Sequence, residues 1–86
     1  MIPEPFLHDD SGAVRFWVLV DGIEVGATIR KETLHHRFAP GRSDDQPLAT
    51  YQAHAAEIAE AVRRRVAAGS IEPVMLREHD LPMPAR

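Results

Sequence analysis

Residues 14–29 read VRFWVLVDGIEVGATI, and this stretch decides the fold. Its centre, Asp21-Gly22, is a preferred two-residue hairpin turn, because both central residues of a type I′ turn need positive φ. The flanking segments Val14–Val20 and Ile23–Ile29 are rich in the β-branched residues that favour strands. The sequence therefore predicts a β-hairpin centred on this turn.

The two-residue turn also fixes which residues of the two strands face each other. Successive strand residues alternate between the two sides of a sheet, so each facing pair shares one side. One side is almost entirely apolar, and we expect it to be the core. Its facing pairs are Val20–Ile23, Val18–Val25, Phe16–Ala27 and Val14–Ile29.

The opposite side of the hairpin carries Trp17 and Leu19, with Arg15 at its far end. Trp17 faces Gly26, so its ring is expected to lie across bare backbone, a packing device found in sheets. The two apolar residues leave two alternatives open. Either the chain covers them, with Ile2 and Phe6 or with a third strand, or they form a protein interface, a homodimer included.

Two helices are expected after the hairpin. Leu34 and Phe38 lie four residues apart, as core-facing side chains of a short helix over Arg30–Phe38 would. An Ala-Pro-Gly run at 39–41 ends that helix, because proline and glycine do not readily continue one. Leu48–Ala68 predicts the second helix, with apolar residues in one stripe at about 100° per residue.

The last strand and the end of the chain complete the expected fold. Ile71–Leu76 predicts a third strand, and Pro73 places it at an edge because proline lacks a ladder donor. The fold class is therefore α+β, in the order β-β-α-α-β. A small antiparallel or mixed sheet is built on the β-hairpin, two helices pack on one face, and the final strand lies at the edge. The strand order and an additional N-terminal strand are left open.

The domain organisation follows from the length and from the proline-containing end. We expect residues 1–80 to form a single α+β domain and residues 81–86 to form a flexible C-terminal tail, with the chain loose from Arg77 onward.

Composition and charge exclude or disfavour several classes of protein. The 86 residues contain no cysteine, which excludes disulfides and thiolate chemistry, and the net charge of −3 does not favour binding to a phosphate backbone. The N-terminus lacks the basic residues of a signal peptide. The longest apolar run, Phe16–Val20, is far shorter than the ~20 residues that span a bilayer. We therefore expect a cytoplasmic protein without a membrane segment.

The run Arg63-Arg64-Arg65 invites a nucleic-acid interpretation. Consecutive helical residues are about 100° apart, so the three side chains spread over roughly 200° and do not form one surface. Glu60 has the spacing for ion pairs with Arg63 and Arg64, which favours a solvated helix face. Weak nucleic-acid binding through Arg37, Arg42, Arg63 and Arg64 is kept as the alternative function.

Catalytic and metal-binding motifs are absent from the sequence. Glu32 and His36 have a spacing that can grip a metal, but two ligands do not make a site. There is no Gly-x-Ser-x-Gly elbow and no phosphate-binding glycine loop. We therefore expect no metal, no cofactor and no enzymatic activity. An enzyme of unknown type remains the second alternative, since catalytic groups can converge from distant positions.

The chain resembles a family of short bacterial proteins, the domain of unknown function 1488, over most of residues 6–80. The resemblance is carried by the run Val14-Arg15-Phe16-Trp17 before Asp21-Gly22, by Val25–Ile29, by Glu32-Thr33-Leu34 with Phe38, and by a long helix ending near Gly69. Arg30 departs from the pattern, because a serine- or threonine-type helix cap is expected there. The resemblance implies a compact bacterial α+β domain and supplies no activity.

The leading hypothesis is a non-catalytic protein-interaction module. A protein partner or self-association through Trp17 and Leu19 is expected, because tryptophan is enriched where interfaces concentrate their binding energy. Nucleic acid is the less favoured partner.

Overall fold

The computed structural model describes residues 3–41 and 46–81. A four-stranded sheet has the order β1-β2-β3-β4, and its strands are β1 (Phe6–His8), β2 (Ala13–Val20), β3 (Ile23–Arg30) and β4 (Val74–Leu76). Strands β1 to β3 are antiparallel neighbours, and β4 runs parallel to β3. The helices are α1 (Lys31–Phe38), α2 (Pro47–Ala53), α3 (Ala55–Ala67) and a short 3₁₀ helix η1 (Glu78–Asp80). The expected α+β class with a mixed sheet is confirmed.

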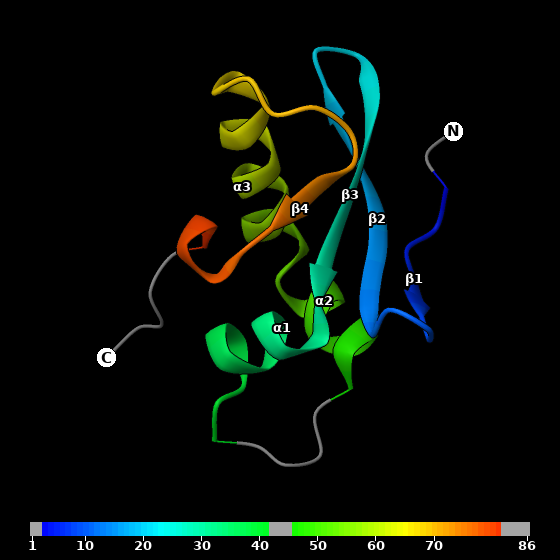
Figure 1. The fold of residues 1–86 in the computed structure, drawn as a ribbon, viewed down its shortest axis with the longest axis vertical. Coiled ribbons are helices and arrows are strands. Elements are labelled where there is room, and N and C mark those ends of the chain that lie inside the picture. The colour runs from blue at the N-terminus through cyan, green and yellow to red at the C-terminus, as the bar shows by residue number, and fades with distance from the viewer. Residues whose placement is uncertain (1–2, 42–45, 82–86) are drawn as a thin grey trace.

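The hairpin of β2 and β3 has the predicted turn and register. Asp21 and Gly22 have φ values of 52° and 78°, which are the positive values that a type I′ turn requires. Trp17 faces Gly26 and Phe16 faces Ala27, as the two-residue turn dictates. Figure 1 shows the hairpin upright with its turn at the top and helix α3 beside it. The predicted division of the hairpin into two faces is therefore correct.

The core lies between one face of the sheet and the helices. Tyr51 from α2 packs against Phe16 with ring centroids 4.8 Å apart, and Ile58 of α3 is fully buried. The remaining core residues come from β2, β3, β4, α1, α3 and the residue after η1: Val14, Val18, Val25, Ala27, Ile29, Leu34, Ala61, Val62, Val74, Leu76 and Leu81.

The expected core face is not fully buried at the end beside the hairpin turn. Val20 is half-buried and Ile23 is 64% exposed, so the prediction that all eight hairpin residues are core is wrong for Ile23. These two residues flank the turn, where β2 and β3 continue beyond their paired neighbours β1 and β4. The hairpin tip thus projects from the packed part of the domain.

The structure contains one strand and one helix break that the β-β-α-α-β order lacked. The N-terminal strand β1, left open by the sequence, pairs with the first half of β2. The single helix expected over Leu48–Ala68 is divided into α2 and α3 at His54, whose φ of −122° and ψ of 22° are not helical. The His54 ring stacks on Phe38 of α1 at 4.1 Å, so a contact distant in sequence accompanies the break.

Helix α1 begins at Lys31, one residue later than expected, and Arg30 at its N-cap makes no side-chain capping hydrogen bond. The backbone N–H of Lys31 donates instead to the carbonyl of Gly12 at 2.9 Å. One of the unpaired amide groups of the first helical turn is thus satisfied by the loop between β1 and β2. The neighbouring loop thus serves the first helical amide, whereas a serine or threonine cap would accept from the second or third.

The C-terminal part is more ordered than expected. Strand β4 covers only Val74–Leu76 of the expected Ile71–Leu76, at the sheet edge as predicted. The expectation of a loose chain from Arg77 onward is wrong for residues 77–81, because η1 follows β4 and Leu81 is buried in the core. The prediction for residues 82–86 lies outside the described residues, as does the proposed covering role of Ile2.

Candidate functional site: the outer face of the sheet

The outer face is the side of the sheet turned away from the core. The register assigns residues to it from all four strands, because residues that face each other in neighbouring strands share a side. These residues are Phe6, His8, Ala13, Arg15, Trp17, Leu19, Glu24, Gly26, Thr28, Arg30 and Met75. None of them belongs to the buried cluster that the helices cover.

Trp17 lies at the centre of the outer face. A Cβ built on Gly26 would lie 3.5 Å from the indole Nε1, so the ring covers this glycine as predicted. The Phe6 ring lies on the other side of Trp17, with centroids 6.2 Å apart. Trp17 is therefore half-buried between β1 and β3, and the chain itself supplies part of the cover that the sequence left open.

Large apolar side chains remain exposed around Trp17. Phe6 is 43% exposed, Leu19 46% and Met75 57%. In the described part of the chain, two other large apolar residues are comparably exposed, Ile23 at the hairpin tip and Ile71 in the loop before β4. Because apolar groups concentrated on one surface are typical of binding sites, the outer face is the candidate interaction surface.

A shallow hollow occupies the end of the outer face away from the hairpin turn. Its volume is about 380 Å³, and its lining includes the small residues Ala13 and Thr28 and the cationic residues Arg15 and Arg30. The remaining lining residues are His8, Ser11, Pro73 and Met75, so the lining contains no carboxylate. This hollow suits an apolar group or a group of negative charge.

The sequence identified two residues of this surface, Trp17 and Leu19, and the structure places both on the outer face. It missed Met75, which joins them because β4 pairs with β3 and sets Met75 beside Thr28. Phe6 was considered only as a cover, and it also contributes exposed apolar surface. The alternation within β4 was readable, but no local signal indicated which strand β4 would join.

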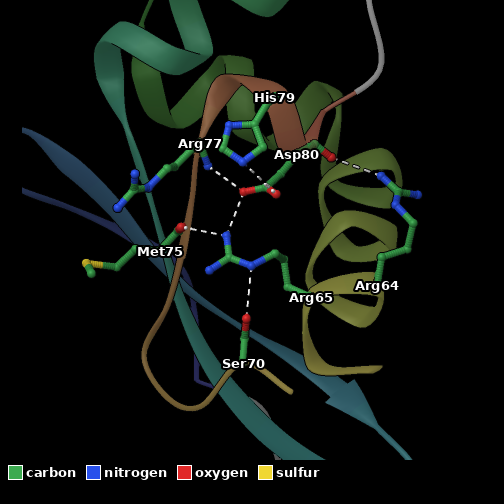
Figure 2. A network of polar contacts seen from close by, with 7 residues as sticks. All are labelled: Arg64, Arg65, Ser70, Met75, Arg77, His79 and Asp80. Atoms are coloured by element: carbon green, nitrogen blue, oxygen red, sulfur yellow. Dashed lines mark hydrogen bonds and ion pairs between the residues drawn. The ribbon is translucent and has the colours of Figure 1, made fainter. Parts of the chain in front are cut away.

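The three consecutive arginines of α3 bind two different partners, Glu60 for Arg63 and Asp80 for both Arg64 and Arg65. Arg63 pairs with Glu60 at 2.8 Å, and Arg64 donates to the carbonyl of Asp80 at 3.0 Å. Arg65 binds the Asp80 carboxylate at 2.6 Å, and it also donates to Ser70 and to the carbonyl of Met75. Figure 2 shows Arg64 and Arg65 of α3 meeting Asp80 of η1, with Ser70 and Met75 also beside Arg65. The network, here called the Asp80 clamp, ties the C-terminal segment to α3.

Of the other arginines of the nucleic-acid alternative, Arg37 is half-buried in α1, and Arg42 lies outside the described residues.

A comparison with family models matches residues 5–76 to the family described as a protein of unknown function, DUF1488. The chain belongs to the DUF1488 family. The match runs from the residue before β1 to the last residue of β4, and it includes every residue of the outer face. No curated protein and no solved structure matches the chain.

Other reactive groups of this DUF1488 domain are dispersed. His36 pairs with Glu78 at 3.3 Å and His54 with Glu57 at 3.1 Å. Across residues 3–41 and 46–81, no group of three His, Asp or Glu residues is arranged to hold a metal ion.

Burial raises the pKa of Tyr51, whose ring packs on Phe16 in the core. None of the helices described in this domain is long and apolar enough to span a membrane.

Proposed function

We propose that this DUF1488 domain is a non-catalytic protein-interaction module and that the outer face of the sheet is its binding surface. The observation that carries the proposal is that Phe6, Leu19 and Met75 are exposed on the same side of the sheet as Trp17. Interfaces concentrate their binding energy in such a centre, where an aromatic anchor is surrounded by residues that exclude water.

The polar surroundings of this centre support the same proposal. Arg15 and Arg30 flank the apolar residues at one end of the face, and Glu24 lies at the other. An apolar centre with a polar and charged rim is the usual organisation of a protein interface. Arginine is also among the residues enriched at such surfaces.

Site-specific photo-crosslinking in the native cells tests the proposal. A photoreactive phenylalanine analogue is placed at Leu19 or at Met75, both exposed on the outer face. The control position is Glu57, which is exposed on α3. We expect crosslinked protein from the two outer-face positions and none above background from the control. A Trp17→Ala change should weaken the crosslinking at Met75 because it removes the aromatic anchor.

The same experiment contains the results that contradict the proposal. Equal crosslinking from Leu19, Met75 and Glu57 would show that the outer face is not a specific surface. Products that disappear after nuclease treatment would indicate nucleic acid rather than protein as the partner. Thermal unfolding of Trp17→Ala distinguishes loss of binding from loss of the fold.

A further inference from the structure

We propose that the occupant of the outer face is a second copy of this chain, related by a two-fold axis that lies between the two sheets and crosses their strands. This inference rests on the proposed function and names its partner. A two-fold interface uses the same surface twice, so each feature of the surface must find its complement on that surface. The outer face meets this requirement in both shape and charge.

The two ends of the outer face are complementary in shape. Leu19 is 46% exposed beside the hairpin turn, at one end of the face. The opposite end is the hollow of about 380 Å³, whose lining includes Ala13 and Thr28. A face with an exposed apolar side chain at one end and a hollow at the other fits its own copy when the two copies run in opposite directions.

Charge is divided in the same direction along the strands. Arg15 and Arg30 lie at the hollow, together with His8. Glu24 faces Leu19 at the other end, and the Glu72 carboxylate lies 3.9 Å from the Cβ position of Gly26. When the strands of the two copies run in opposite directions, the cationic end of one copy therefore lies against the acidic end of the other. Such complementarity fixes the register of an interface and rejects the parallel arrangement.

The register of β2 and β3 indicates where the proposed two-fold axis crosses the strands. If the axis crosses the strands at Phe16 and Ala27, which face each other, Leu19 lies over the second copy's Ala13. The same operation places Trp17 over the second copy's Arg15 and Glu24 over its Arg30. Stacked sheets lie about 10 Å apart with strand directions within about 30°, so these pairs meet to within roughly one strand spacing.

Each of these pairs is chemically favourable. Leu19 enters the hollow above Ala13, and the guanidinium of Arg15 lies against the indole of Trp17, where a cation is attracted to the face of the ring. Arg30 already contacts Glu32 at 3.5 Å in an exposed pair, and an exposed pair of this kind is easily exchanged for one with Glu24.

The size of the face sets the strength of the association. Strands β2 and β3 are each about 26 Å long and β1 and β4 about 10 Å long, so at a spacing of about 4.8 Å between strands the flat area is roughly 350 Å². Stable interfaces bury about 800 Å² on each partner. We therefore expect a reversible dimer with a Kd in the micromolar range rather than a permanent one.

Sedimentation of the purified full-length chain from about 5 µM to about 500 µM tests the inference. We expect the mass to approach that of two chains as concentration rises. Leu19→Glu, Arg30→Glu and Glu24→Arg should each weaken the dimer about tenfold or more. The matched control is Ile71→Glu, because Ile71 is 84% exposed but lies outside the outer face, and it should leave the dimer unchanged.

Mixing two variants gives the decisive readout. Arg30→Glu chains carry acids at both ends of the face, and Glu24→Arg chains carry cations at both ends. Each variant alone should dimerise poorly, whereas the mixture should form a heterodimer with a Kd within about threefold of the unmodified protein. A role of these residues within one chain would not produce this rescue.

The outcomes separate this inference from the proposed function. A monomer at about 500 µM, or a dimer that none of these changes weakens, would overturn the inference. If Leu19 then still crosslinks to a protein of different mass, the outer face binds another protein and the proposed function stands. Absence of specific crosslinking would contradict both.

Discussion

Replacing Asp80 with alanine should destabilise the domain more than any other change outside the core. The Asp80 carboxylate is 9% exposed and accepts hydrogen bonds from Arg65 at 2.6 Å and from the backbone N–H of Arg77 at 2.9 Å. Without it, Arg65 keeps its contacts with Ser70 and the Met75 carbonyl but loses its counter-charge. The change therefore leaves a half-buried guanidinium without its anion.

The magnitude follows from the burial of the two partners. Hydrogen bonds to charged groups contribute about 1.5–3 kcal/mol, and loss of one partner of a fully buried pair costs about 3–5 kcal/mol. Arg65 is 30% exposed, which places the pair between a surface and a buried one. We expect the free energy of unfolding to fall by about 2–3 kcal/mol. For a domain of this size that corresponds to a decrease in Tm of roughly 8–24 °C.

Urea and thermal unfolding followed by circular dichroism measure this loss. The control is Glu78→Ala on the same 3₁₀ helix, because Glu78 pairs with His36 where both side chains are exposed, and such a pair contributes at most about 1 kcal/mol. A loss below about 0.5 kcal/mol for Asp80→Ala, or one equal to that of the control, would refute the reasoning. An Arg65–Asp80 double-mutant cycle should give a coupling energy of at least about 1 kcal/mol.

Three further predictions concern the hairpin and the core. Gly26→Ala should stabilise the domain by about 0.5 kcal/mol in urea unfolding, since its Cβ meets Trp17 Nε1 at an ordinary 3.5 Å. Gly22→Ala should instead destabilise by about 1 kcal/mol, because Gly22 has a φ of 78°. Because burial raises the pKa of Tyr51 above its usual 10.0, the folded state keeps the proton longer, and stability should fall as pH rises above that value. Tyr51→Phe should remove this fall.

A specific result would contradict each of these predictions. Equal effects of alanine at Gly22 and Gly26 would mean that backbone conformation does not distinguish the two positions. An alkaline loss of stability that persists in Tyr51→Phe would assign the titration to another group.

The hairpin was predictable because its determinants are local. Asp21-Gly22 sets the turn, the turn sets the register, and alternation then divides the residues between two faces. Trp17 and Leu19 were therefore placed on the outer face without knowledge of the other elements. The exposure of Ile23 was not predictable in this way, because it depends on where the helices end relative to the hairpin tip.

The helix break and the clamp depend on contacts between distant residues. Tyr51 and Ile58 are seven residues apart and belong to one apolar stripe whether or not the helix is broken between them. The stacking of His54 on Phe38 leaves no periodic trace in the sequence. Likewise, three adjacent arginines are visible in the sequence, but the carboxylate that binds Arg65 is known only once η1 is placed beside α3. Met75 was missed for the same reason.

The parallel pairing of β4 with β3 has a consequence for the order of assembly. The β2–β3 hairpin closes over two residues, whereas β4 reaches β3 only after α1, α2 and α3 have been traversed. Closing the longer loop costs more chain entropy, so we expect β4 to dock last and to open first. A chain ending before Asp80 would keep the hairpin and lose the clamp. Because β4 brings Met75 to the outer face, part of the binding surface is completed only at this final step of folding.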